Sequence, residues 1–191
     1  SWLLRQSDNV IPPNCRISGV AESRFYRLIS MPFGCPIMQS VMPKSHPIPQ
    51  FGENSPDVKY VLRPGGYALI FDPKGNVAVV HTPTGYYLPG GGQHQGESLE
   101  ETVIREVAEE CGIRISLVSY LGIADELVVA PSEGQHYRKR CTFFLAYSIG
   151  EFEKGEDDHD LVWLSPEEAL ASLNHASQRW AVGRWAEIAR V

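Results

Sequence analysis

The sequence predicts an α/β protein, an α/β/α sandwich around a mixed β-sheet. Three observations favour this architecture. Apolar segments of strand length, separated by turn residues, begin near residue 60 and recur as far as residue 164. One long amphipathic pattern, residues 99–111, interrupts them, and two helical patterns follow residue 165. Strands that flank one central helix, with helices at the end of the chain, fit helical layers on a mixed sheet.

The first 50 residues differ from the rest. They hold half of the fourteen prolines and show no sustained period, apart from one candidate short helix at residues 21–30. We expect residues 1–50 to be a proline-rich, poorly ordered extension and residues 51–191 to form the folded domain. An ordered arm packed on the domain is the alternative. The first residue is Ser1, and residues 1–45 are also hypothesised to include sequence upstream of the natural start.

The folded region is expected to open with a β-hairpin. Apolar residues 66–71 and 77–81 flank the turn sequence 72–76, which combines Asp, Pro, Gly and Asn. Residues 86–88 then form a short strand that leads into a glycine-rich loop, residues 89–92.

A helix follows this loop. Ser98 is a good N-cap, and Glu101 completes a capping box. Gly112 stands where a helix usually ends. The apolar face consists of Leu99, Val103, Val107 and Cys111.

The remaining elements follow in order. Residues 113–118, 120–130, 141–148 and 161–164 are expected to be strands, and residues 150–160 an acidic loop. Ser165 caps a helix that runs to about Leu173, and a second helix starts near Ser177. We expect the side chains of Ala181, Trp185 and Ile188 to point inward and Trp163 to lie in the core.

Composition excludes some classes of function. The net charge of −6 argues against binding of a nucleic-acid polymer through its phosphates. The sequence contains no apolar run long enough to span a bilayer, so no membrane association is expected. The four cysteines lack metal-binding spacing and are expected to be reduced, which favours a cytoplasmic location.

Three carboxylates on the central helix indicate a bound cation. Glu106, Glu109 and Glu110 stand at i, i+3 and i+4, where like charges repel. Two of them also lie in the last turn, where the helix dipole disfavours anions. A cation would offset both effects, and ligands that are all hard oxygens suit Mg²⁺, or Mn²⁺. The alternative is a solvated acidic helix face.

The stretch Gly91–Ile113, GGQHQGESLEETVIREVAEECGI, resembles the Nudix box at every defining position. Residues 87–90 and 63–68 also look like those of MutT-like Nudix proteins. The resemblance implies a pyrophosphohydrolase in which water attacks phosphorus near bound Mg²⁺. It assigns metal binding to Gly91, Glu106, Glu109 and Glu110, with catalytic roles for Glu106 and Glu109 and support from Glu97 and Arg105. Arg105 can pair with either Glu101 or Glu97.

The family often draws one more ligand or base from the region of the acidic loop. Asp157 is our candidate there, among Glu156, Asp158 and Asp160. For substrate binding we expect Arg63 and the basic cluster around Lys139, with Arg138 and Arg140 as its candidates; ordinary surface charge is the alternative. Tyr87, or its neighbour Tyr86, is the candidate to stack on a base. His94 is expected to be solvated, and His81 and His159 have no metal-type partner by spacing.

The implied substrate is a nucleoside diphosphate linked to another group: a nucleoside triphosphate, a nucleotide sugar or ADP-ribose, or a dinucleoside polyphosphate. The alternative function is a nucleotide sensor that does not turn over its ligand, and an isopentenyl diphosphate isomerase is a weaker one. A homodimer is a possible oligomeric state.

Overall fold

The computed structural model describes residues 47–131, 133–151 and 159–189. The candidate helix at residues 21–30 and almost all of the expected proline-rich extension lie outside these ranges. The described strands and helices, in chain order, are β1 (Gln50–Phe51), β2 (Val61–Ile70), β3 (Val77–Thr82), β4 (Gly85–Tyr87), β5 (Gly90–Gly92), α3 (Leu99–Cys111), β6 (Ile113–Ala130), β7 (Gln135–Glu151), β8 (Asp160–Leu164), α4 (Pro166–Ser172) and α5 (Ala176–Ile188).

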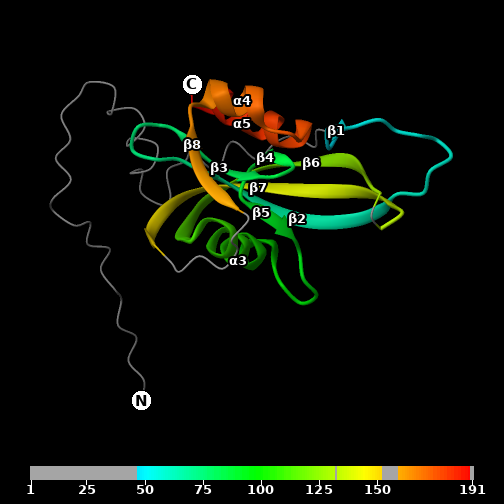
Figure 1. The fold of residues 1–191 in the computed structure, drawn as a ribbon, viewed down its shortest axis with the longest axis horizontal. Coiled ribbons are helices and arrows are strands. Elements are labelled where there is room, and N and C mark those ends of the chain that lie inside the picture. The colour runs from blue at the N-terminus through cyan, green and yellow to red at the C-terminus, as the bar shows by residue number, and fades with distance from the viewer. Residues whose placement is uncertain (1–46, 132, 152–158, 190–191) are drawn as a thin grey trace, which may run out of the picture. The chain divides into compact units, whose positions relative to one another are not determined.

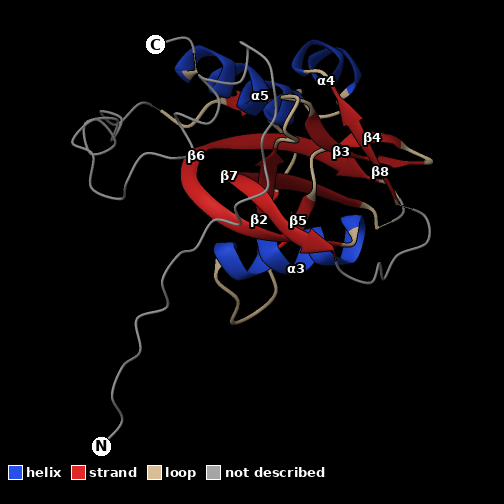
Figure 2. Ribbon diagram, turned by 90° about the vertical axis from the view of Figure 1, so that its left-hand side faces the viewer, coloured by secondary structure: helices blue, strands red, loops and turns tan. Residues whose placement is uncertain are grey.

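The strands form two sheets between two helical layers. The larger sheet has the order β1–β6–β7–β2–β5, and the smaller one has the order β4–β3–β8. Strands β2 and β7 are parallel, whereas β6 and β7 are antiparallel, so the larger sheet is mixed. Helix α3 lies on one side of the sheets and α4 and α5 lie on the other, as Figures 1 and 2 show. This arrangement confirms the predicted α/β/α sandwich.

Close packing of α3 on β2 depends on a glycine. A Cβ at Gly66 would lie 2.5 Å from Val103 and 2.8 Å from the carbonyl oxygen of Leu99. The core on this side buries the apolar face of α3, including Val103 and Val107, which are 0% exposed. On the other side of the sheet, the ring of Phe71 packs on Trp185 of α5, with centroids 4.1 Å apart.

The boundaries of α3 follow the predicted caps. Ser98 accepts a hydrogen bond from the Glu101 N–H, and the Glu101 side chain accepts one in return. Gly112 ends the helix with φ 65° and ψ 26°, a left-handed conformation that favours glycine. The same capping box, between Ser165 and Glu168, opens α4. None of the helices in the described part of the chain has the length and apolarity needed to cross a bilayer.

The expected hairpin of β2 and β3 is wrong as a strand pairing. The Asp72 carboxylate does organise the turn, accepting hydrogen bonds from the N–H groups of Lys74 and Asn76 at 2.8 Å. After one bridge, Phe71 to Val77, the strands separate into different sheets. The two strands do not pair further because both edges of each are occupied by other strands. Strand β2 pairs with β5 and β7, and β3 pairs with β4 and β8.

Other expectations needed smaller corrections. The expected glycine-rich loop contains strand β5, which pairs with β2, and the expected strands 113–118 and 120–130 form one strand with irregular register near Ser119. Trp163 is 37% exposed because it lies on the edge strand β8, and Ile188 is 38% exposed because it ends α5. Ala181 is fully buried, as expected.

Candidate active site

The site begins where two glycine-rich strands run side by side. Gly91 pairs with Gly66, and Gly92 with Gly65, in the antiparallel β2–β5 ladder. A Cβ at Gly91 would lie 2.5 Å from the carboxyl carbon of Glu106. The absence of a side chain at Gly91 therefore lets the Glu106 carboxylate rest against the β5 backbone.

A second carboxylate of α3 reaches the same strand. The Gly90 N–H donates a hydrogen bond of 2.9 Å to Oε2 of Glu110. Gly90 has φ 136°, which favours glycine, so this N–H is presented by a conformation that other residues rarely adopt. Glu106 and Glu110, four residues apart on the helix, thus converge on two successive glycines.

Arg105 joins the remaining carboxylates of the box. Its Nε donates to Glu97 Oε1 at 2.6 Å, and its Nη1 donates to Glu106 Oε1 at 2.9 Å and to Glu109 Oε2 at 3.0 Å. Of the two partners left open by the sequence, Glu97 is the one observed, because Glu101 caps the helix through Ser98.

These hydrogen bonds favour the charged forms of Glu97 and Arg105. The pKa of Glu97 falls to about 2, because Arg105 and the backbone N–H of His94 stabilise its carboxylate. Hydrogen bonding to Glu97 raises the pKa of Arg105 above its usual value. The backbone of His94 thereby positions Glu97, a role compatible with the expectation that its side chain is solvated.

The donors that the box offers to a cation are all oxygens. Within the described residues, no three carboxylate, imidazole or thiol groups converge as a preformed metal cage. The cradle around Gly91, which a Cβ would fill, nevertheless holds Glu106 beside the strand that also binds Glu110. Donors of this kind, on one face of a helix, fit Mg²⁺ or Mn²⁺ better than a softer metal.

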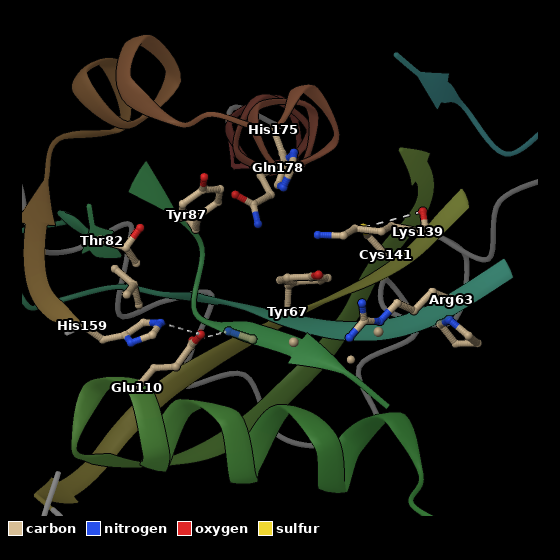
Figure 3. A pocket seen from close by; sticks show the side chains of 16 residues that line it. Arg63, Tyr67, Thr82, Tyr87, Glu110, Lys139, Cys141, His159, His175 and Gln178 are labelled. Atoms are coloured by element: carbon tan, nitrogen blue, oxygen red, sulfur yellow. Dashed lines mark hydrogen bonds and ion pairs between the residues drawn. The ribbon is translucent and has the colours of Figure 1, made fainter. Parts of the chain in front are cut away.

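A pocket of about 220 Å³ lies between the two sheets and α5, and β5 forms part of its floor. In Figure 3, Glu110 and His159 stand at the lower left and Arg63 at the lower right. Tyr87, His175 and Gln178 line the upper wall, and Lys139 lies on the right. The remaining lining residues are Pro64, Gly65, Tyr67, Val80, Thr82, Gly90, Gly91, Gly92 and Cys141.

The basic cluster is divided by strand alternation. Lys139 of β7 pairs in register with Arg63 of β2, so both side chains face the pocket. Arg138 and Arg140, which we expected to bind substrate, are not among the pocket-lining residues. Arg140 instead forms two hydrogen bonds with the buried Asp125 at 2.9 and 3.0 Å. The Arg138 Nε is buried without a hydrogen-bond partner in the described part of the chain.

Of the other candidates, Tyr87 lines the pocket with its ring 5.4 Å from His175. Tyr86 lies on the opposite face of β4, with its ring 4.6 Å from that of His81. Asp157, Glu156 and Asp158 fall outside the described residues.

Sequence reasoning missed several lining residues. His159 Nε2 lies 3.7 Å from Glu110 Oε1, although 49 positions separate them in the chain. Gln178 comes from α5 and His175 is the N-cap of this helix, which the sequence placed in the core only through its apolar residues. No local motif marks these positions, because they reach the pocket through the packing of separate elements.

The comparison with known proteins agrees with this geometry. The family model for the NUDIX domain matches residues 61–186, more than half of the chain. A protein of Mycobacterium tuberculosis (strain CDC 1551 / Oshkosh), provisionally named mutator protein MutT4, is 36% identical over 104 residues. That match covers 53% of this chain, and the chain spans only 40% of that relative.

Two solved structures are similar. The MutT protein from Methanosarcina mazei Go1 is 23% identical with a TM-score of 0.58, over 71% of this chain and 100% of that one. The MutT NUDIX hydrolase from Burkholderia pseudomallei is 27% identical with a TM-score of 0.50, over 65% and 98%.

The fold and the site thus define an α/β/α protein of the type built around a glycine strand and an acidic helix. The chain belongs to the Nudix hydrolase family. This confirms the resemblance noted in the sequence.

Proposed function

We propose that this chain is a Mg²⁺-dependent pyrophosphohydrolase that cleaves a nucleoside diphosphate linked to another group. The observation that carries the proposal is the convergence of Glu106 and Glu110 on Gly90 and Gly91, beside a pocket with two cations. A substrate of this class carries several negative charges. This site offers carboxylates that can bind a metal ion and, in the same pocket, cationic side chains that can bind phosphate.

Glu106, Glu109 and Glu110, with the Gly91 carbonyl, would hold the metal. Mg²⁺ supplies charge neutralisation and acidifies bound water. Glu97 and Arg105 are positioning residues, since Arg105 ties together Glu97, Glu106 and Glu109.

The general base is proposed to be one of the box carboxylates, Glu106 or Glu109. Asp157 of the acidic region is the alternative base or additional ligand. Each of these three residues is replaced in turn by its amide, and kcat is measured as a function of pH. The replacement that removes the dependence of kcat on the base identifies the general base.

Arg63 and Lys139 are proposed to bind phosphate, and Tyr87 to stack on the base. Arg63 lies close to β5, since its Nε is 3.5 Å from where a Cβ of Gly92 would stand. Burial lowers the pKa of Lys139, so an anionic ligand nearby would favour its charged form.

A panel of substrates tests this function. Phosphate or nucleotide release is measured with Mg²⁺ and with Mn²⁺ on nucleoside triphosphates, nucleotide sugars, ADP-ribose and dinucleoside polyphosphates. We expect metal-dependent release that Glu110→Gln abolishes. Nucleotide binding without turnover on any of the four classes would favour the sensor instead.

The same proposal includes location and partners. Cys111 and Cys141 are both buried, and a reducing cytoplasm would keep their thiols reduced. The expected partner is the small nucleotide substrate. Light scattering at working concentration distinguishes a monomer from a homodimer.

A further inference from the structure

A buried amide faces the pocket on the wall opposite β5. Gln178 of α5 is only 1% exposed, yet it lines the same pocket as Glu110 and the glycines of β5. A side chain with two hydrogen-bonding ends is seldom buried beside a cavity unless both ends have partners.

One end of this amide has its partner in the protein. The backbone N–H of Leu88, itself buried, donates a hydrogen bond of 3.0 Å to Gln178 Oε1. This is the one hydrogen bond that the Gln178 side chain makes within the described residues. Rotating the amide by half a turn would set its NH₂ against the Leu88 N–H, donor against donor. The orientation is therefore fixed, and Nε2 faces the cavity (Figure 3).

The charged side chains on the floor of the pocket lie on the side opposite the Gln178 amide. Glu110, the glycines of β5 and Arg63 lie along the floor, whereas Gln178 and Tyr87 lie along the upper wall. If the phosphates of a nucleotide occupy the floor, its base reaches the upper wall. The Tyr87 ring there offers an aromatic surface, and Nε2 of Gln178 offers a donor that makes no hydrogen bond within the described residues.

We propose that Gln178 is a specificity-determining residue that selects nucleobases presenting a carbonyl oxygen over bases presenting an amino group at the same position. The inference rests on the proposed function, because it takes the ligand to be a nucleotide. A carbonyl accepts a hydrogen bond from Nε2, whereas an amino group would oppose one donor to another in a buried place.

Two pairs of nucleotides isolate this contact. ITP carries a 6-oxo and ATP a 6-amino group, and UTP carries a 4-oxo and CTP a 4-amino group. In each pair only the oxo member also has a hydrogen on the adjacent ring nitrogen. Dissociation constants are measured by calorimetry in EDTA, where no divalent metal supports turnover. The intact chain is expected to bind the oxo member of at least one pair on the order of tenfold more tightly.

Exchange of the donor for an acceptor provides the matched control. In Gln178→Glu, one carboxylate oxygen still accepts from Leu88 and the other faces the cavity, which Lys139 also lines. The preference should therefore reverse toward ATP or CTP. Gln178→Met keeps the volume but removes the donor, so the preference should disappear. Thermal melting verifies that each variant is folded.

Several outcomes would overturn the proposal: equal affinity within both pairs, an unchanged oxo preference in both variants, or no binding of any of the four nucleotides. Hydrolysis with Mg²⁺ is recorded separately on the same nucleotides. Selective binding without hydrolysis would leave Gln178 in its role and reject the proposed enzymatic function. Hydrolysis without selective binding would support the proposed enzymatic function and reject the role of Gln178.

Discussion

The Glu110 carboxylate and the backbone N–H of Gly90 meet at 2.9 Å, which ties the last turn of α3 to the edge strand β5. Because β5 also pairs with β2, this contact connects the acidic helix to the larger sheet at the floor of the pocket. The other carboxylate oxygen of Glu110 lies 3.7 Å from Nε2 of His159, the residue that precedes β8 of the smaller sheet. One carboxylate thus brings three separate parts of the fold to one place.

Glu110→Gln should preserve the fold and remove the chemistry. The amide oxygen can still accept from Gly90, so the melting temperature without metal should change little. Loss of one anionic ligand should lower kcat by at least roughly a hundredfold. Mg²⁺ should also raise the melting temperature of the unaltered chain but not of the variant. Turnover within a fewfold of the unaltered chain would refute the ligand assignment.

Gly91→Ala should displace the Glu106 carboxylate, because the new Cβ would stand 2.5 Å from its carboxyl carbon. We expect a loss of turnover of roughly tenfold or more, since a shift of about 1 Å at a catalytic group is costly. Gly183→Ala is the control, as nothing lies within 4 Å of a Cβ there. This second change should leave kcat intact and stabilise α5 by about 0.5–1 kcal/mol. Steady-state kinetics and thermal melting measure both.

Substitution of Lys139 should affect substrate binding, whereas substitution of its neighbour Arg140 should affect the stability of the fold. Lys139→Met removes a pocket cation and should raise KM for a polyphosphate substrate by roughly tenfold. Arg140→Met leaves the buried Asp125 without its partner and should cost about 1–3 kcal/mol of unfolding free energy, with little change in KM. The opposite result, with KM altered by Arg140→Met alone, would show that the pocket is not the substrate site.

Glu126 should make the fold sensitive to acid. Burial alone raises its pKa, but hydrogen bonds from His175 and from Ser177 at the start of α5 lower it from 4.5 to about 2. A depressed pKa stabilises the fold above about pH 4.5, and this contribution disappears as the pH falls from 4.5 toward 2. Chemical unfolding at pH 7, 4 and 3 should show a smaller loss for Glu126→Gln than for the unaltered chain. An identical loss would remove Glu126 from this role.

The sequence alone determined the elements whose causes are local. The capping box of Ser98 and Glu101, the left-handed Gly112 and the apolar spacing of α3 all act within a few residues, so the helix had the predicted ends. The box motif identified the family and the acidic residues of one helix face. The break expected at Ser119 appeared as an irregular register inside one strand.

Tertiary structure decided what depends on partners far apart in the chain. Sequence cannot tell which strand β2 will choose, so the expected hairpin yielded to pairing with β7 and β5. That same parallel register with β7 turned Lys139 toward the pocket and Arg138 and Arg140 away from it, because neighbouring residues on a strand face opposite sides. Gln178 and His159 joined the site only because α5 packs on β6, and β8 packs on β3 and α3, around the pocket that β5 also lines. No local pattern encodes that packing.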